Sequence, residues 1–321
     1  MQFNTVILAA GFGKRLVSNT SKVLVNLINK PIIIHLLDNI NDVISTKNTY
    51  IIVGHKAHDV EKTVSEFYPY VNFILQKEQL GTGHAVAQTE KVINMNNEHT
   101  LILAGDVPLI DAQLIKGFYD FHITQRSDIT VLTTPINDPT GYGRIIRDEN
   151  RNMILSIVEE KDASEKQKEI NEINSGIYLI KTSLLFKLLK EVKTDNTQNE
   201  YYLTDIIKIG KTKGLTIHPY LFKNSEILRG INSRDDLAKI ANYIYQSTLN
   251  KHQSQGVTIL SPATTFIEPE VEIEKDVIIE PLVHIKGKSH IKTNSIIKSF
   301  SYLTDYVSKE AEIIGPSFKK N

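Results

Sequence analysis

The sequence predicts an α/β protein: a Rossmann-like, mostly parallel sheet, then a long helix and a short parallel β-helix. Two observations support this fold class. Up to about residue 225, apolar runs alternate with amphipathic helical segments, a pattern typical of a parallel sheet covered by helices. After Gly256, apolar residues recur every six positions, a period that fits neither a helix nor an alternating strand.

The predicted strands of the sheet are short runs of β-branched and apolar residues. They span residues 5–9, 49–53, 71–75, 100–104 and 128–133. Ligands of open parallel sheets bind beyond the carboxyl ends of the strands. We therefore expect the loop after Ala9, the turn at residues 81–83 and Asp106 to meet at one edge of the sheet.

One long helix is predicted over residues 234–253, because apolar residues follow a helical period there and Gly256 comes soon after them. The apolar stripe consists of Leu237, Ile240, Ala241, Ile244 and Leu249. We therefore expect three parts: a sheet domain over residues 1–232, a linker helix over 233–255 and a β-helix over 256–321.

The six-residue repeat places one aliphatic residue at a fixed position of each repeat. These residues are Ile273, Ile279, Ile285, Ile291, Ile297 and Leu303, and the first three repeats add Val271, Val277 and Val283. In a parallel β-helix each repeat forms one side of a coil, and stacked coils build a continuous core. The segment is long enough for two to three coils, so we expect an exposed end.

The composition favours a small-molecule partner. The 321 residues carry 37 basic and 37 acidic side chains, so the overall charge favours neither nucleic acid nor an anionic membrane. There is no cysteine, which excludes disulfides, thiolate catalysis and a cysteine metal site. The first apolar run ends at Gly11, too short for a signal peptide or a membrane span, so we expect a cytoplasmic protein.

The loop after the first strand has the chemistry of an anion site. Gly11 and Gly13 let the backbone turn and approach a ligand, and Arg15 and Lys22 supply positive charge. A glycine turn followed by surface cations is also common without any ligand. The glycine spacing matches neither a dinucleotide fingerprint nor a Walker loop.

Two further positions at the same sheet edge carry useful chemistry. Asp106 offers a hard oxygen ligand suited to Mg²⁺, although an aspartate capping the next helix is an equally good interpretation. Gln76 has both amide donors and an acceptor, which can read the edge of a pyrimidine. Thr82 can cap the helix that starts beside it, although the turn could also be a loop without function. We expect His84 to be structural rather than a catalytic base.

A second group of polar residues lies farther along the chain, within residues 141–144, 157–162 and 172–176. Carbohydrate hydroxyls need both donors and acceptors, and Glu159 with Asn174 would supply both. Either residue could instead belong to an ordinary turn.

Taken together, these motifs resemble the bacterial bifunctional enzyme that makes UDP-N-acetylglucosamine, and specifically its N-terminal uridylyltransferase part. The matching segments are LAAGFGKR, SKVL, LQKEQLGTGHAVAQT, GDVPL, GYGRI, IVEEKDA, EINSGIYL, NEYYLTDII and GINSR, in that order. The resemblance implies a nucleotide-diphospho-sugar transferase type of sheet and a left-handed, truncated hexapeptide-repeat β-helix.

The resemblance also implies roles for individual residues. Contacts with uridine would come from Leu8, Ala9, Ala10, Gly11, Gln76, Gly81 and Thr82. Contacts with N-acetylglucosamine would come from Gly143, Glu159 and Asn174. Arg15 and Lys22 would hold the phosphates and act in catalysis, while Asp106 and Asn232 would ligate Mg²⁺, Asn232 also touching substrate. From the residues alone, Asn232 would be interpreted as part of a turn.

The implied reaction is Mg²⁺-dependent uridylyl transfer from UTP to N-acetylglucosamine-1-phosphate, which supplies a cell-wall precursor. We expect no acetyltransferase activity, because the family places those residues in β-helix coils beyond Asn321. A homotrimer through the β-helix is possible. Two alternatives stay open: a nucleotidyltransferase for another sugar 1-phosphate or nucleotide, and a non-catalytic sugar-nucleotide-binding module.

Overall fold

The computed structural model describes residues 2–148, 150, 153–316 and 318–320. The chain forms two compact units. The first comprises Met1–Asn26 and Lys30–Arg234, and the second comprises Leu27–Asn29 and Asp235–Asn321. The first unit contains the sheet, and the second contains the long helix with the repeat region.

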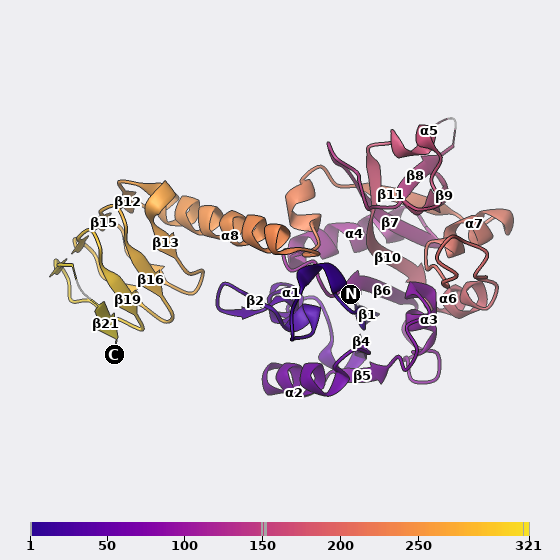
Figure 1. The fold of residues 1–321 in the computed structure, drawn as a ribbon, viewed down its shortest axis with the longest axis horizontal. Helices are drawn as coiled ribbons and strands as arrows, with labels where there is room; N and C mark the ends of the chain where they lie inside the picture. Colours follow the sequence, from indigo (N-terminus) through magenta and orange to yellow (C-terminus); the bar gives the residue numbers. More distant parts are fainter. Residues whose placement is uncertain (1, 149, 151–152, 317, 321) are drawn as a thin grey trace. The chain divides into compact units, whose positions relative to one another are not determined.

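The central sheet of the first unit has the strand order β11-β7-β10-β6-β1-β4-β5 (Figure 1). The strands are β1 (Phe3–Ala9), β4 (Thr49–Val53), β5 (Asn72–Leu75), β6 (His99–Ala104), β7 (Ile129–Pro135), β10 (Glu172–Lys181) and β11 (Ile217–Leu221). Neighbours are parallel except at β10, which is antiparallel to both β6 and β7. The hairpin of β8 (Arg144–Arg147) and β9 (Ile154–Val158) joins through β10. The predicted mostly parallel α/β fold is confirmed.

Both faces of this sheet are apolar and covered, which explains why β1 is continuously apolar from Val6 to Ala9. Ile7 of β1 belongs to one buried cluster and Val6 to the other. The first cluster includes residues of α1 (Ile32–Ile40), α2 (Ala57–Phe67) and α4 (Ala112–Thr124). The second includes residues of α3 (Thr82–Ala87), α6 (Thr182–Leu189) and α7 (Asp205–Thr212).

The strand order reverses direction beside β1. The chain proceeds from β1 to β4 and β5 on one side, and then returns to place β6 on the other side. In open α/β sheets a crevice forms outside the carboxyl ends of the strands at such a switch point. Leu8 of β1 is in register with Ala104 of β6, so the segments that follow these strands begin side by side.

Helix α8 spans Arg234–Ser254, one residue longer than the sequence predicts. Within the predicted apolar stripe, Ile240 and Leu249 are fully buried and the others are half-buried. Leu249 belongs to the apolar core of the repeat region, so the end of this helix packs on the first coil.

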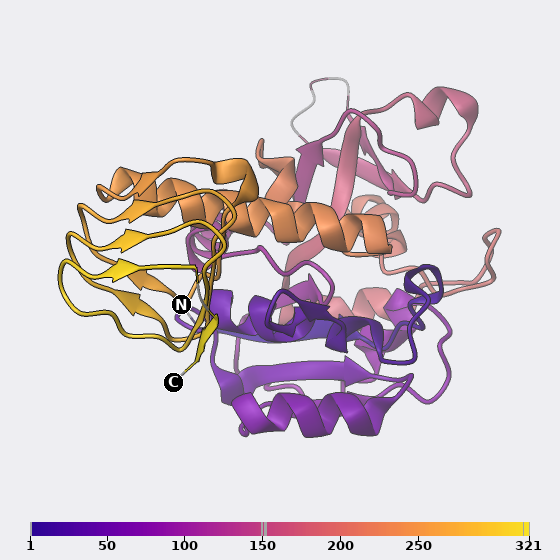
Figure 2. The ribbon, with the colours of Figure 1, turned by 60° about the vertical axis from the view of Figure 1, so that its left-hand side comes forward.

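The repeat region forms short parallel strands stacked in three sheets (Figure 2). The strands are β12 (Thr258–Ile259), β13 (Phe266–Ile267), β14 (Glu272–Ile273), β15 (Ile278–Ile279), β16 (His284–Lys286), β17 (His290–Ile291), β18 (Ile296–Ile297), β19 (Tyr302–Thr304), β20 (Ile313–Ile314) and β21 (Phe318–Lys320). Ile279 pairs with Ile297, and Ile285 pairs with Leu303, so one coil takes three six-residue repeats. The predicted inward aliphatic positions are all buried.

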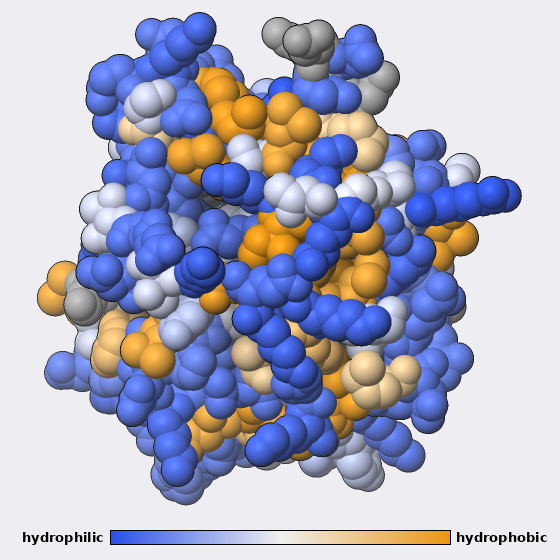
Figure 3. Space-filling model, turned by 90° about the vertical axis from the view of Figure 1, so that its right-hand side faces the viewer, coloured by the Kyte–Doolittle hydropathy of each residue, from blue (hydrophilic) through white to orange (hydrophobic). Residues whose placement is uncertain are grey.

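One face of the molecule is mostly hydrophilic, with apolar side chains gathered in separate strips (Figure 3). Among the described residues, no helix is long and apolar enough to cross a membrane.

His122 makes stability sensitive to acid. It is 1% exposed, its Nδ1 lies 2.7 Å from Thr130 Oγ1, and its ring meets His99 edge-on at 4.9 Å. Burial, followed by the nearby charge of His99, lowers the pKa of His122 to about 3 from an ordinary 6.5. Between these values the unfolded chain binds a proton that the folded protein excludes. We therefore predict that the unfolding free energy falls as pH drops from 6.5 toward 3, by about 1.4 kcal/mol per pH unit for this group.

Urea unfolding at pH 7.5, 6 and 5 measures this loss. His122→Gln should show a shallower loss than the wild type, whereas the exposed His58→Gln control should follow the wild type. Identical pH slopes for His122→Gln and the wild type would contradict the prediction.

Candidate active site

A cavity of about 500 Å³ opens at the switch point between β1 and β6. Its walls come from the ends of β1, β5 and β6, from the start of α3 and from the loop that carries Lys22. The residues that line it include Leu8, Ala9, Ala10, Gly11, Lys22, Gln76, Gly81, Thr82 and Asp106. The fold thus brings every residue predicted to contact uridine to one cavity, together with one predicted phosphate ligand and one predicted metal ligand.

Lys22, which lines this cavity, joins the two predicted metal ligands. Its Nζ donates a hydrogen bond to Asp106 Oδ2, and a second one of 2.8 Å to Asn232 Oδ1. A backbone bond of 2.9 Å from Ile231 N to Asp106 O ties the Asn232 loop to the end of β6. Two oxygens from distant parts of the chain therefore converge on one positive group.

These oxygens fit a divalent cation. A carboxylate and an amide oxygen already surround an ammonium ion, and hard cations prefer such oxygen donors. In the described part of the chain, no three His, Cys, Asp or Glu side chains form a metal-holding group.

The glycine at position 13 lets the loop close over Lys22. Its φ is +61°, and a Cβ built there would lie 2.8 Å from Lys22 Cβ. Any other residue would be strained in conformation and would collide with the lysine. Buried Val23 and Leu24 then fix Lys22 from its C-terminal side.

Arg15 lies apart from the Lys22 cluster. It is exposed, next to fully buried Leu16, and it lines an opening of about 430 Å³ together with Glu159 and Lys161. The structure therefore places Arg15 beside a predicted sugar ligand rather than beside Asp106.

The glycine turn at residues 81–83 is held by a distant segment. Gly81 has a φ of +112°, and a Cβ there would lie 2.6 Å from Tyr201 O. Gly83 N donates to the same carbonyl at 2.7 Å. Thr82 does not cap its helix, because its hydroxyl accepts a 3.0 Å bond from Leu203 N instead. Thr82 is therefore not the cap of α3, and the GTGHAV and EYYLTDII motifs are in direct contact.

Asp106 is not a helix cap either. The N-cap of α4 is Asp111, whose carboxylate accepts a 2.7 Å bond from Leu114 N. Asp106 therefore does not cap the next helix, and it lines the cavity instead.

The three predicted sugar ligands lie together. Asn174 N donates to Gly143 O at 2.9 Å, and a Cβ built on Gly143 would lie 3.5 Å from Glu159 Oε2. Thr204 donates a 3.0 Å hydrogen bond to Glu159 Oε1. Burial raises the pKa of Glu159, while this hydrogen bond opposes the shift in part. Sequence analysis assigned no role to Thr204, and its position in the EYYLTDII motif was the only feature that could have pointed to it.

Arg144 is a buried cation that sequence reasoning did not single out. It is 1% exposed, forms a 2.7 Å ion pair with Glu160 and donates to Tyr142 O. The guanidinium thus ties the Gly143 loop to the loop that carries Glu159. Because the guanidinium is buried, leaving it without a partner would be costly, so this link supports the loop of the predicted sugar ligand Glu159.

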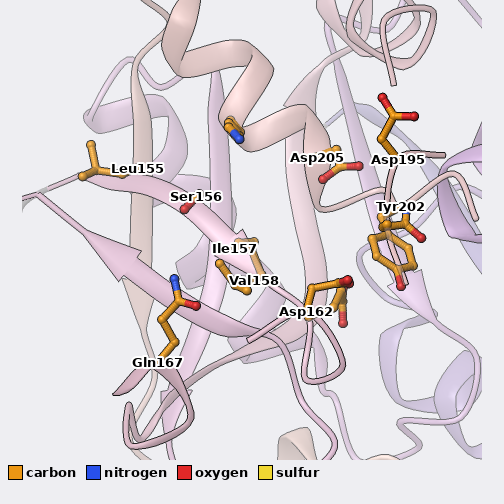
Figure 4. Close-up of a pocket in the computed structure, with 12 residues that line it drawn as sticks. Leu155, Ser156, Ile157, Val158, Asp162, Gln167, Asp195, Tyr202 and Asp205 are labelled. Carbon is orange, nitrogen blue, oxygen red and sulfur yellow. The ribbon is translucent and has the colours of Figure 1, made fainter. Parts of the chain in front are cut away.

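A second cavity, of about 520 Å³, is also lined by Glu159, and Figure 4 shows other residues of its lining. Its walls include the carboxylates of Glu159, Asp162, Asp195 and Asp205, with Lys208 as a cation. Burial and the neighbouring Asp162 raise the pKa of Asp205. Such a wall would repel phosphate, so the cavity with Lys22 is the better candidate although the two are similar in size.

Solved structures share this fold. A UDP-glucose pyrophosphorylase complexed with UDP-glucose has a TM-score of 0.61 at 19% identity, covering 77% of this chain and 100% of that one. HddC from Yersinia pseudotuberculosis has a TM-score of 0.56 at 21% identity, covering 75% and 99%. At these identities the likeness concerns the fold alone.

The cavity lies at the switch point of the sheet, where open α/β folds bind their ligands. The nucleotidyl transferase family matches residues 4–224, and the chain belongs to that family.

Curated relatives agree with the resemblance found in the motifs. Bifunctional protein GlmU of Lactococcus lactis subsp. lactis is 41% identical over 268 residues, and that of Caldanaerobacter subterraneus subsp. tengcongensis is 41% identical over 269. Each match covers 84% of this chain and 57% of the relative. The chain thus spans little more than half the length of these relatives.

Removing the Lys22 charge should strengthen metal binding. The ammonium competes for the oxygens of Asp106 and Asn232, and its charge repels a divalent cation. We predict that Lys22→Met binds Mn²⁺ several-fold more tightly than the wild type in the absence of nucleotide. Electron paramagnetic resonance titration of free Mn²⁺ measures this affinity. The exposed Lys62→Met serves as control, and an unchanged Mn²⁺ affinity of Lys22→Met would contradict the prediction.

Proposed function

We propose that this protein transfers the uridylyl group of UTP to N-acetylglucosamine-1-phosphate, forming UDP-N-acetylglucosamine and pyrophosphate. The observation that carries the proposal is the convergence of Asp106 and Asn232 on Lys22, beside a cavity that Lys22 and Asp106 line. Membership of the nucleotidyl transferase family and relatives named bifunctional protein GlmU support it.

The cavity has suitable walls for a nucleoside. Leu8, Ala9 and Ala10 provide an apolar surface at the end of β1, and Gln76 contributes a polar amide. A few polar groups in a largely apolar cavity are the usual means of orienting a small ligand. Gly143, Glu159 and Asn174 would then meet the hydroxyl groups of the sugar.

Charge neutralisation is the main task at the reacting phosphates. Asp106 and Asn232 would hold Mg²⁺, which when bound neutralises phosphate oxygens. Lys22 would hold the phosphates of UTP, and Arg15 would reach the phosphate of the sugar from its position beside Glu159.

The chemistry needs no general base. A phosphate oxygen of the sugar phosphate forms a bond to the α-phosphorus of UTP, while the bond from that phosphorus to the bridging oxygen breaks and pyrophosphate leaves. Because the nucleophile is already an anion, catalysis rests on alignment and on charge compensation. This agrees with a site built from cations, glycines and amides.

Pyrophosphate release tests the proposal. The purified protein with Mg²⁺, UTP and N-acetylglucosamine-1-phosphate should release pyrophosphate faster than with glucose-1-phosphate or dTTP. A preference for another pair would favour a different sugar nucleotidyltransferase. Binding of UDP-N-acetylglucosamine without pyrophosphate release would favour a non-catalytic binding module.

Asp106→Asn should lower kcat by about 100-fold or more, because one charged ligand of the phosphate–metal centre is lost. The exposed Asp235→Asn control should retain full activity. If Asp106→Asn kept wild-type turnover with an unchanged Mg²⁺ dependence, Asp106 would not be a metal ligand.

Arg15→Ala should lower kcat by about 100-fold, with a smaller change in KM, if its contact tightens in the transition state. Initial rates over a range of sugar phosphate concentrations separate the two constants. Lys62→Ala is the matched control for loss of an exposed cation. Equal turnover for Arg15→Ala and the wild type would remove Arg15 from the catalytic group.

A further inference from the structure

The imidazole of His84 lies between two side-chain amides. Gln76 Nε2 is 3.1 Å from its Nδ1, and Gln88 Nε2 is 3.0 Å from its Nε2. A neutral imidazole carries one N–H, so one ring nitrogen accepts and the other donates. The two amides therefore compete, since the ring cannot accept a hydrogen bond from both.

The backbone decides the orientation of Gln76. Its Nε2 also lies 3.2 Å from Gly81 O, and a carbonyl oxygen can only accept, so the amide nitrogen faces the turn. The second amide hydrogen then reaches His84 Nδ1, which must accept. This requires the ring proton on Nε2.

Burial decides which amide prevails. Both amide nitrogens also donate to a backbone carbonyl, since Gln88 Nε2 lies 3.1 Å from His84 O. Gln76 is 3% exposed, whereas Gln88 is half-buried and can exchange its contacts for water. Leaving a buried donor unpaired costs roughly 1–3 kcal/mol, so the arrangement that satisfies Gln76 is the more stable. In this arrangement, Gln76 Oε1 points away from the imidazole ring. It has no hydrogen-bond partner among the described residues, and the Gln76 side chain lines the cavity.

We propose that His84 is a positioning residue for base selection. As its Nε2–H tautomer, His84 holds the Gln76 amide with Oε1 toward the cavity. The site then accepts a base that has a ring N–H. Uracil has such a donor at N3, and cytosine has an acceptor there. The inference rests on the proposed function, because it assumes that the cavity holds the base of the nucleotide.

Two substitutions separate this role from packing. The ring of His84 also packs near Tyr201, with centroids 6.3 Å apart. His84→Phe keeps a ring but removes both nitrogens. His84→Asn loses the ring but places an amide oxygen near the position of Nδ1, where it can still accept from Gln76. If His84 acts through the packing of its ring, Phe should be the better substitute. If it acts as a hydrogen-bond acceptor for Gln76, Asn should be the better substitute.

The test measures kcat/KM for UTP and for CTP in the wild type, His84→Phe, His84→Asn and a Gln88→Leu control. We expect the UTP/CTP preference to fall about tenfold in His84→Phe, the equivalent of one hydrogen bond. It should stay within about threefold of the wild type in His84→Asn and Gln88→Leu. An equal loss for both nucleotides in His84→Phe, or the same loss of preference in His84→Asn, would overturn the proposal.

Two further measurements keep the proposal testable on its own. If the wild type does not transfer uridylyl groups, the proposed function fails, and the relative affinities for UMP and CMP in the same variants still test base selection. If His84→Phe does not fold, nitrogen NMR of wild-type His84 should show the Nε2–H tautomer. An Nδ1–H tautomer would overturn the inference.

Discussion

The reversal of strand order beside β1 is the constraint on which the rest of the first unit depends. Leu8 and Ala104 are in register, and Gly105 N donates to Leu8 O at 2.9 Å, so the two strands leave the sheet together. The basic loop and Asp106 follow from these ends. Without that pairing, Lys22 would have no carboxylate to meet, and the cavity would lose two of its walls.

The site also has to hold opposite charges close together without a substrate. Lys22 is compensated by Asp106 and by the amide oxygen of Asn232, which keeps a partly buried ammonium from standing alone. The same oxygens are then ready for another cation, and the same ammonium for an anion. A balanced cluster of this kind can bind a metal and a phosphate together while the net charge of the site changes little.

Local signals carried most of the sequence prediction. Strand β4 spans the predicted residues, and the six-residue repeat identified the buried positions of the β-helix, because both patterns reflect neighbours in the chain. The contacts of Asn232 and Thr82 could not be predicted this way, since their partners Lys22 and Leu203 lie far away in sequence. Arg144 was missed for a related reason: only the fold shows that it is buried.

Affinity and selectivity come from different kinds of groups in this arrangement. Charges act over long distances and with little direction, so Lys22 and Arg15 would serve any nucleotide and any sugar phosphate. Discrimination has to come from short, directed contacts, in which an unpaired buried group is costly. Gln76 on the proposed base side and Asn174 on the proposed sugar side have their amides held by neighbours, Gly81 and Tyr178. Whatever fixes the direction of these amides therefore determines what the enzyme accepts.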